Sequence, residues 1–293
     1  MARLIAIVGP TASGKTTLSL RVAEALGAEI VSADSRLVYR GMDIGTAKPS
    51  REQRSRVPHH CIDLVDPGER YDVARYRRDA LDAIKAIAAR GRVAVVAGGT
   101  GLYVRALLDG LDLDAVPHDP VLRRELEALS ASEVFARLES LDPDAAALAR
   151  GNARRAVRYL EIASLAGPVA AVQRRGPPLD AVRIGLSPAR ETTDAAIATR
   201  VRSMIDAGVL DETRALVARG LDPTLPSMTG HGYLHWAAHL RGALSLEDAV
   251  ARTVRDTVAY ARRQMTWFRR DPLITWYDPM QGDPLPRVLE AAH

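Results

Sequence analysis

The sequence has few of the features that mark disulfide-stapled or membrane-embedded proteins. Cys61 is the single cysteine among 293 residues, which excludes an intramolecular disulfide framework and suits a reducing cytoplasm. No apolar run approaches the roughly 18 residues that a membrane-spanning helix requires. With 47% hydrophobic and 26% charged residues, the composition is that of an ordinary globular chain. We therefore expect a soluble cytoplasmic protein that buries its own core.

Lysine is also scarce and occurs only at Lys15, Lys48 and Lys85. Arginine therefore carries nearly all of the positive charge. With 40 Lys+Arg and 36 Asp+Glu residues, the net charge is +4. Arginine stays charged and can form two parallel hydrogen bonds with a phosphate group. Because +4 alone does not predict nucleic-acid binding, the positions of the arginines have to decide that question.

Short apolar runs alternate with helical patterns, and glycines follow several of the runs. Continuous apolar runs of this length are typical of parallel strands that are buried on both faces. They predict strands at residues 4–8, 29–33, 93–97 and 182–186, and helices at residues 15–26 and 75–90. The alternation indicates an α/β fold with a parallel sheet.

The middle of the chain has a different composition. Residues 120–167 are rich in Ala, Leu, Glu and Arg, with helical patterns and no strand pattern. We therefore expect an all-helical insertion over residues 112–181, within an α/β core formed by residues 1–111 and 182–293. Within that core, the pattern is helical again over residues 192–270.

The segment between the first strand and the first helix has the pattern of a phosphate-binding loop. It matches G-x-x-x-x-G-K-[ST] at every fixed position, in the strand-to-helix context where this pattern binds ATP and related polyphosphates. Backbone N–H groups surround the phosphate, the lysine adds positive charge, and the last hydroxyl holds Mg²⁺. The predicted phosphate-binding residues are Gly9, Pro10, Thr11, Ala12, Ser13, Gly14, Lys15 and Thr16, with Thr16 as the Mg²⁺ ligand.

The strand predicted at residues 93–97 lacks the acid that nucleotide hydrolases place at such a strand end. Gly98, Gly99 and Thr100 follow it instead. This argues against an ATPase motor and leaves a small-molecule kinase or another use of a bound diphosphate. Glycines at the carboxyl end of a parallel strand allow a ligand to approach the backbone, and Thr100 can form a hydrogen bond there. A purely structural turn is the alternative.

An acid does stand at the end of the second strand, at Asp34. It opens a segment over residues 34–49 that reads DSRLVYRGMDIGTAKP. Together with the phosphate loop, this segment resembles the tRNA dimethylallyltransferase family. Further matches in the same order are GGTGLY at residues 98–103, PHHCID at residues 58–63 and RQMTWFR at residues 263–269. The resemblance extends over nearly the whole chain.

The resemblance implies a P-loop NTPase-like core with an inserted helical domain that grips the anticodon stem-loop of tRNA. It also implies transfer of a dimethylallyl group from dimethylallyl diphosphate to N6 of the adenosine just 3′ of the anticodon, with Mg²⁺ as cofactor. Asp34 matches the base that accepts the amine proton, and Lys15, Thr16 and Thr100 match groups around the departing diphosphate. A turn or helix cap is the alternative role for Asp34.

The resemblance further implies contacts with tRNA. An extruded base and the phosphates of a single-stranded loop need stacking surfaces and cations. The residues that match tRNA contacts are Asp34, Ser35, Arg36, Leu37, Thr100, Arg123, Arg154, Arg155, Arg158, Gly232, Tyr233, Arg262, Arg263, Gln264, Trp267 and Arg269. For each single arginine, a solvated helix face is the alternative.

Several positions depart from the family pattern. Leu37 replaces a glutamine that follows Asp-Ser-x, and Val258 replaces an arginine that helps to bind diphosphate. Leu234 and His235 replace a basic residue followed by Glu or Gln. Where the family has Asn-Asp-Pro before the basic helix, residues 151–153 of this sequence are Gly-Asn-Ala. These departures remove polar groups that the family uses to hold its substrates.

Other functions share parts of this pattern. An isopentenyltransferase that acts on free adenine nucleotides would share the core but would have little use for the insertion. A small-molecule P-loop kinase would consume ATP, and a tRNA-binding protein with weakened catalysis would fit the losses at Leu37 and Val258. We expect a monomer, because one tRNA occupies one channel and no coiled-coil pattern is evident.

Two remaining features favour structural roles. His231, His235 and His239 have the spacing of one helix face, but no adjacent acid supports a zinc site of the H-E-x-x-H kind. Cys61 follows His60, and we expect a buried structural thiol there, not a nucleophile.

Overall fold

The computed structural model describes residues 4–111, 116–172, 176–222, 224–230 and 232–292. Contacts between residues divide the chain into two compact units. The first unit comprises residues 1–104 and 179–293, and the second comprises residues 105–178. Among the described residues, no helix is long and apolar enough to cross a membrane.

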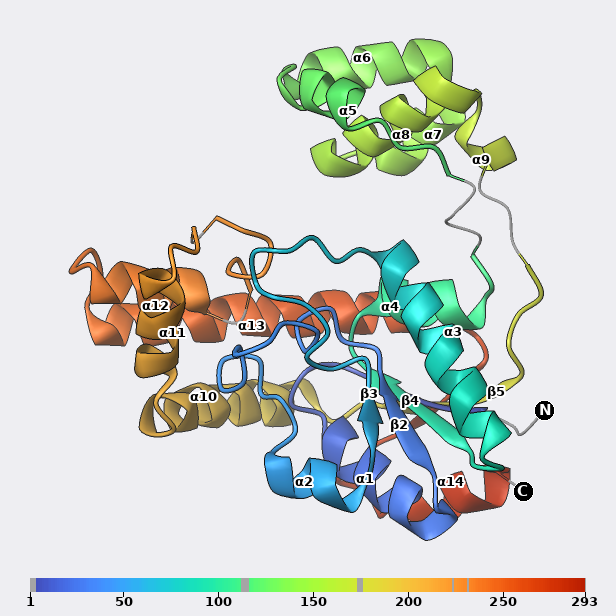
Figure 1. The fold of residues 1–293 in the computed structure, drawn as a ribbon, viewed down its shortest axis with the longest axis vertical. Coiled ribbons are helices and arrows are strands. Elements are labelled where there is room, and N and C mark those ends of the chain that lie inside the picture. The colour runs from blue at the N-terminus through green and yellow to red at the C-terminus, as the bar shows by residue number, and fades with distance from the viewer. Residues whose placement is uncertain (1–3, 112–115, 173–175, 223, 231, 293) are drawn as a thin grey trace. The chain divides into compact units, whose positions relative to one another are not determined.

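The first unit contains a six-stranded parallel sheet in the order β3-β2-β4-β1-β5-β6 (Figure 1). Its strands are β1 (Leu4–Val8), β2 (Glu29–Ser32), β3 (His59–His60), β4 (Ala94–Gly98), β5 (Ala181–Leu186) and β6 (Ile274–Tyr277). The four predicted strands correspond to β1, β2, β4 and β5, so the predicted α/β parallel-sheet class is confirmed. The two strands that were not predicted are the short edge strands β3 and β6.

The central strand β1 is buried at all five positions, as its continuous apolar sequence predicts. Its side chains pack in one core with those of α1, β4 and β5, including Ile5, Leu20, Val95 and Ile184. This core fixes the end of β1, and therefore the start of the phosphate loop, in the middle of the sheet.

Helices of the first unit follow the predicted alternation. They are α1 (Lys15–Leu26), α2 (Arg51–Arg56), α3 (Val73–Ala89), α4 (Gly101–Leu108), α10 (Arg190–Asp206), α11 (Val209–Ala218), α12 (Tyr233–Leu240), α13 (Leu246–Phe268) and α14 (Leu285–Ala292), with the end of α4 belonging to the second unit. Helix α1 has the predicted bounds, because Gly14 and Gly27 adopt left-handed conformations at its two ends. Helices α10 to α13 gather beside the sheet (Figure 1) and share a second core around the fully buried Trp236.

The second unit consists of short helices around its own apolar core. They are α5 (Pro120–Glu127), α6 (Ala131–Leu141), α7 (Pro143–Ala149), α8 (Ala153–Ala166) and α9 (Val169–Val172), and the described residues 116–172 contain no strand. The first four begin at side-chain caps, which are Asp119, Ser130, Asp142 and Asn152. These caps explain where such short helices start.

A buried carboxylate holds one side of this second unit together. Glu161 is fully buried and accepts hydrogen bonds from Arg123 and Arg158, and His118 lies 2.8 Å from it. Burial alone would raise the pKa of Glu161, but the hydrogen bonds from Arg123, Arg158 and His118 lower it to about 2. Two arginines predicted to contact tRNA therefore have structural partners within their own unit.

The contact between β2 and β4 predicts a sensitive position. A Cβ atom at Gly98 would lie 2.2 Å from the carbonyl oxygen of Ala33. Because that backbone would have to move, we expect Gly98→Ala to lower the free energy of unfolding by about 1–3 kcal/mol, measured by urea unfolding. Gly68→Ala is the control, since its nearest contact would be an ordinary 3.7 Å to Leu221. Equal effects of the two substitutions would contradict this prediction.

Candidate functional site

A cavity of about 140 Å³ lies beside the carboxyl ends of β1, β2 and β4 in the first unit. The phosphate loop forms one wall of it, and helices α10 and α13 each contribute side chains. The lining residues important for the chemistry are Ser13, Lys15, Thr16, Ser32, Asp34, Leu37, Arg200, Tyr260 and Gln264. Segments far apart in the sequence thus meet where parallel sheets of this kind bind ligands.

The phosphate loop presents several donors to this cavity. Lys15 Nζ donates a hydrogen bond to the Pro10 carbonyl at 2.5 Å, and burial lowers the pKa of Lys15 to about 7. The hydroxyls of Ser13 and Ser32 are buried at the cavity wall without a hydrogen-bond partner among the described residues. Buried polar groups normally have partners, so these hydroxyls are available for a ligand. The Thr16 hydroxyl belongs to an exposed residue on the same wall.

Arg200 is a second cation in the cavity, and no sequence pattern predicted it there. It lies on α10, and within the described chain it has no hydrogen bond or ion pair. Burial lowers the pKa of Arg200, and its charge contributes to lowering the pKa of Lys15. The only signal in the sequence was an arginine within the apolar stripe of a helix, next to Ile197, Val201 and Met204, all buried.

Asp34 faces the same cavity from the end of β2. The Arg36 N–H donates to Asp34 Oδ1 at 2.9 Å, which forms a local turn. Among the described residues, Oδ2 takes part in no hydrogen bond, so one carboxylate oxygen remains for a ligand. The turn role that was the alternative for Asp34 is therefore present and uses only half of the carboxylate.

Thr100 holds the Asp34 turn in place. Its Oγ1 accepts a hydrogen bond from the Ser35 N–H at 3.0 Å, and its own N–H donates to the Ala33 carbonyl at 3.1 Å. The two turns that follow β2 and β4 are therefore joined by hydrogen bonds on either side of Asp34.

Two predicted tRNA contacts on α13 are turned toward the sheet. Gln264 is buried and hydrogen-bonded to both the phosphate loop and Gly99. Trp267 packs so closely on Gly101 that a Cβ there would lie 2.1 Å from the indole ring. These two side chains connect α13 to the phosphate loop and to the turn and helix that follow β4.

The basic residues of α13 lie on its exposed side. Arg262 pairs with Asp194 at 3.2 Å, and the Arg263 guanidinium lies 5.8 Å from the centre of the Tyr260 ring. Arg269 is also exposed, at the end of the helix. The helix therefore carries cations on one face and contacts with the cavity on the other.

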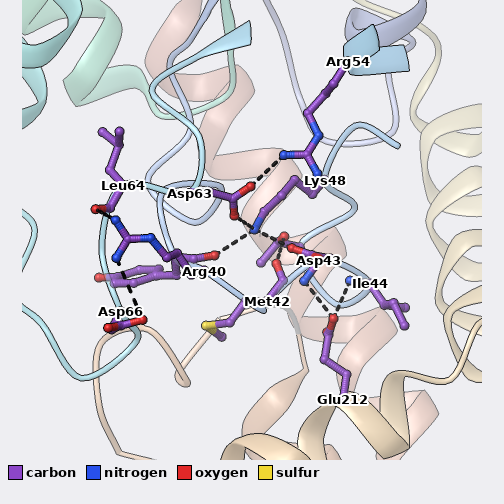
Figure 2. A network of polar contacts seen from close by, with 12 residues as sticks. Arg40, Met42, Asp43, Ile44, Lys48, Arg54, Asp63, Leu64, Asp66 and Glu212 are labelled. Atoms are coloured by element: carbon purple, nitrogen blue, oxygen red, sulfur yellow. Dashed lines mark hydrogen bonds and ion pairs between the residues drawn. The ribbon is translucent and has the colours of Figure 1, made fainter. Parts of the chain in front are cut away.

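The segment that follows Asp34 is held by a polar network (Figure 2). Lys48 is buried, and its Nζ donates to Asp43 and Asp63 at 2.6 Å each. Glu212 on α11 accepts hydrogen bonds from the N–H groups of residues 43, 44 and 45 at 2.8–3.0 Å. The buried Tyr233 donates its hydroxyl to the same carboxylate at 2.6 Å. Tyr233, predicted to contact tRNA, thus supports a loop whose next two residues line the cavity.

The structure shows the surroundings of the positions that depart from the family pattern and of their neighbours. Leu37 lines the cavity, and Val258 packs against the core of α10 to α13. The Arg36 guanidinium donates to the Pro226 carbonyl. Leu234 is 40% exposed, while Gly232 begins α12 in a left-handed conformation.

The histidine and cysteine features also have structural explanations. His235 pairs with Asp256 at 2.8 Å, and His239 lies 3.0 Å from the Leu244 carbonyl. His231 lies outside the described residues, and those described contain no cluster of metal-binding side chains. Burial raises the pKa of Cys61 to about 12, which leaves this thiol protonated and unreactive.

In the second unit, two arginines of α8 are exposed and do not pair with Glu161. Arg154 and Arg155 are exposed at the start of α8, and Arg155 donates to the Leu148 carbonyl at 3.1 Å. Arg154 has no hydrogen bond or ion pair with any residue that the structure describes. These two arginines are the ones that the unit presents to solvent from the predicted basic helix.

The fold and cavity define an α/β P-loop protein with a carboxylate in the same cavity as its phosphate loop. The sequence matches the IPP transferase family over residues 37–271 and the isopentenyl transferase family over residues 2–58. It is 50% identical over 286 residues to a tRNA dimethylallyltransferase of Anaeromyxobacter sp. (strain K), with 94% of this chain and 93% of that relative covered. The chain therefore belongs to the IPP transferase family, which confirms the resemblance seen in its sequence.

Solved structures agree with this assignment. The full-length tRNA isopentenylpyrophosphate transferase from Bacillus halodurans is 39% identical and has a TM-score of 0.75, with 100% of this chain and 95% of that chain covered. A eukaryotic dimethylallyltransferase acting on tRNA has a TM-score of 0.81 at 24% identity and shares the fold.

The position of Arg200 predicts a strong effect on anion binding. We expect Arg200→Met to weaken the affinity for inorganic diphosphate by about 10- to 100-fold, because a charge-assisted hydrogen bond contributes about 1.5–3 kcal/mol. Calorimetric titration measures the affinity. Arg202→Met removes an exposed arginine from the same helix and serves as the control. An unchanged affinity in Arg200→Met would remove this residue from the anion site.

The lowered pKa of Lys15 predicts that diphosphate binding takes up protons. Lys15 is about half protonated near pH 7 in the free protein, and a bound anion favours its charged form. We expect the affinity to fall as the pH rises above about 7, with proton uptake measured by calorimetry in buffers of different ionisation enthalpy. Lys15→Met should remove this uptake, whereas Lys85→Met, at an exposed position, should retain it. Equal uptake in all three proteins would contradict the prediction.

Proposed function

We propose that this protein transfers the dimethylallyl group of dimethylallyl diphosphate to N6 of the adenosine adjacent to the 3′ side of the anticodon in tRNA. The products are N6-dimethylallyladenosine and diphosphate. The observation that carries this proposal is the cavity, which is lined by Lys15 of the phosphate loop, by Arg200 and by Asp34, just after β2. The relatives named tRNA dimethylallyltransferase support the same reaction.

The donor diphosphate would bind to the backbone N–H groups of the phosphate loop. Its charge increases as the bond between the allylic carbon and the diphosphate oxygen breaks. Fixed positive groups already placed at this position stabilise such a leaving group. Lys15 and Arg200 are both buried enough for their pKa values to be lowered, so their charges would act in surroundings of low polarity.

The acceptor amine would be activated by Asp34. As N6 attacks the allylic carbon and the new N–C bond forms, one N6 proton passes to the carboxylate. The oxygen that the local turn leaves free, Oδ2, is suited to this task, and Thr100 holds the turn that carries it. Leu37, on the cavity wall, offers an apolar surface to the allyl group or the base.

Mg²⁺ fits the donor set at this site. Thr16 presents a hydroxyl oxygen, and Mg²⁺ prefers a few protein oxygens together with phosphate oxygens and water. When bound, the ion neutralises charge on the diphosphate as it departs. Thr16 would therefore hold the ion against the substrate.

The tRNA would be held by the exposed arginines. Arg154 and Arg155 on the helical unit offer cations for the anticodon stem-loop, and Arg262, Arg263 and Arg269 do so on α13. We propose that the protein acts as a monomer in the cytoplasm. The arginines at Glu161 would contribute by shaping the helical unit.

The deciding assay incubates the purified protein with unmodified tRNA, Mg²⁺ and labelled dimethylallyl diphosphate. We expect labelled N6-dimethylallyladenosine in tRNA digests. Transfer to free AMP but not to tRNA would favour a nucleotide prenyltransferase, and ATP-dependent phosphorylation would favour a kinase. Folded protein that binds tRNA without prenylating any member of a full tRNA pool would reject the proposed reaction.

Removal of the base predicts a selective loss of turnover. We expect Asp34→Asn to lower kcat by about 10²- to 10⁴-fold, because a positioned base contributes about that factor. The Kd for tRNA, measured by filter binding, should change less than threefold. Asp211→Asn removes a carboxylate whose side chain is 81% exposed and is the matched control. Equal losses of turnover and tRNA affinity would show that Asp34 does not act as the base.

A further inference from the structure

The amide of Gln264 connects two loops that have no sequence proximity to it. Its Oε1 accepts a hydrogen bond from the N–H of Thr11 in the phosphate loop at 2.8 Å. Its Nε2 donates to the carbonyl of Gly99, in the turn after β4, at 2.8 Å. The side chain is only 5% exposed, and it lies against Gly99 so closely that a Cβ there would come within 2.2 Å of Nε2.

These two loops carry different halves of the proposed chemistry. Thr11 belongs to the loop that would bind the diphosphate, and Gly99 precedes Thr100, whose hydroxyl holds the turn of Asp34. A single planar amide therefore spans the gap between the leaving-group side and the base side of the cavity. Tyr260, one helical turn earlier, lines the same cavity, and Thr100 and Gln264 both act to lower its pKa.

We propose that Gln264 is a positioning residue that fixes the distance between the phosphate loop and the Asp34 turn. The inference rests on the proposed function and adds to it a role that is separate from RNA contact. Both polar atoms of the amide face core partners, so a tRNA would find neither of them free. Loss of the bridge would leave the Thr11 N–H and the Gly99 carbonyl without their partner and free the loops to shift.

The reaction is sensitive to such a shift. The attacking amine and the allylic carbon have to be aligned within a fraction of an ångström, and a misplacement of about 1 Å can lower the rate by about 10²-fold. We therefore expect Gln264→Met, which is similar in size but lacks both hydrogen bonds, to lower kcat by about 10- to 100-fold. The Kd for tRNA should stay within threefold of the wild-type value.

Gln264→Glu supplies a readout that a general loss of stability would not reproduce. As a carboxylate, residue 264 can accept from Thr11 but repels the Gly99 carbonyl. As a neutral acid, it can accept from Thr11 and donate to Gly99, which restores the bridge. Burial raises the pKa of a carboxyl group, so protonation should occur at accessible pH.

The test measures kcat of each variant relative to wild type between pH 8.5 and pH 6, at saturating substrates and with the folded fraction determined at each pH. We expect the ratio for Gln264→Glu to rise at least fivefold as the pH falls, while the ratio for Gln264→Met stays flat. Any titration that wild type and variants share cancels in the ratio. Gln281→Glu makes the same change at an exposed position and should have an unchanged, flat ratio.

Calorimetric titration with inorganic diphosphate separates this inference from the proposed reaction. We expect Gln264→Met to weaken diphosphate binding by about fivefold or more, because the phosphate loop loses its support. This loss would uphold the bridge even if wild-type protein failed to prenylate tRNA. Wild-type kcat and diphosphate affinity in Gln264→Met, or a loss confined to tRNA affinity, would overturn the inference.

Discussion

The parallel alignment of β1, β4 and β2 is the constraint on which the site depends. Because the three strands run in the same direction and are neighbours, the segments that follow them emerge at one edge of the sheet. The phosphate loop follows β1, Thr100 follows β4 and Asp34 follows β2. Hydrogen bonds between those turns then fix the cavity. The order and direction of the strands therefore bring the phosphate loop, Asp34 and Thr100 to the same edge of the sheet.

Buried and half-buried charges also stabilise parts of the structure away from the cavity. Lys48 and Glu212 hold the loop after Asp34, while Glu161 organises the arginines of the helical unit. Removing one partner of such a buried pair is costly because the other charge is left uncompensated. The protein therefore has charged side chains that line the cavity and others that shape its loops and helices.

Much of the core could be predicted from the sequence, because β1, the phosphate loop and Asp34 are local patterns whose meaning does not depend on distant residues. Arg200 could not be found in this way, since it meets the phosphate loop only when α10 folds to the wall of the same cavity. Arg158 and Tyr233 illustrate the opposite difficulty. Their residue types suited RNA contact, but each has a partner inside the protein. The partner of Arg158, the buried Glu161, lies three residues along the same helix. Glu212, the partner of Tyr233, comes from a position that no local pattern links to it.

The environment of Cys61 has a practical consequence. This single cysteine is buried, and its raised pKa keeps the thiol protonated at neutral pH. Maleimide and iodoacetamide reagents attack thiolates on accessible side chains. The native chain therefore should not react with thiol-directed labels. One cysteine introduced at an exposed position in each unit would carry a fluorophore pair, so that motion between the units could be followed without deleting a native residue.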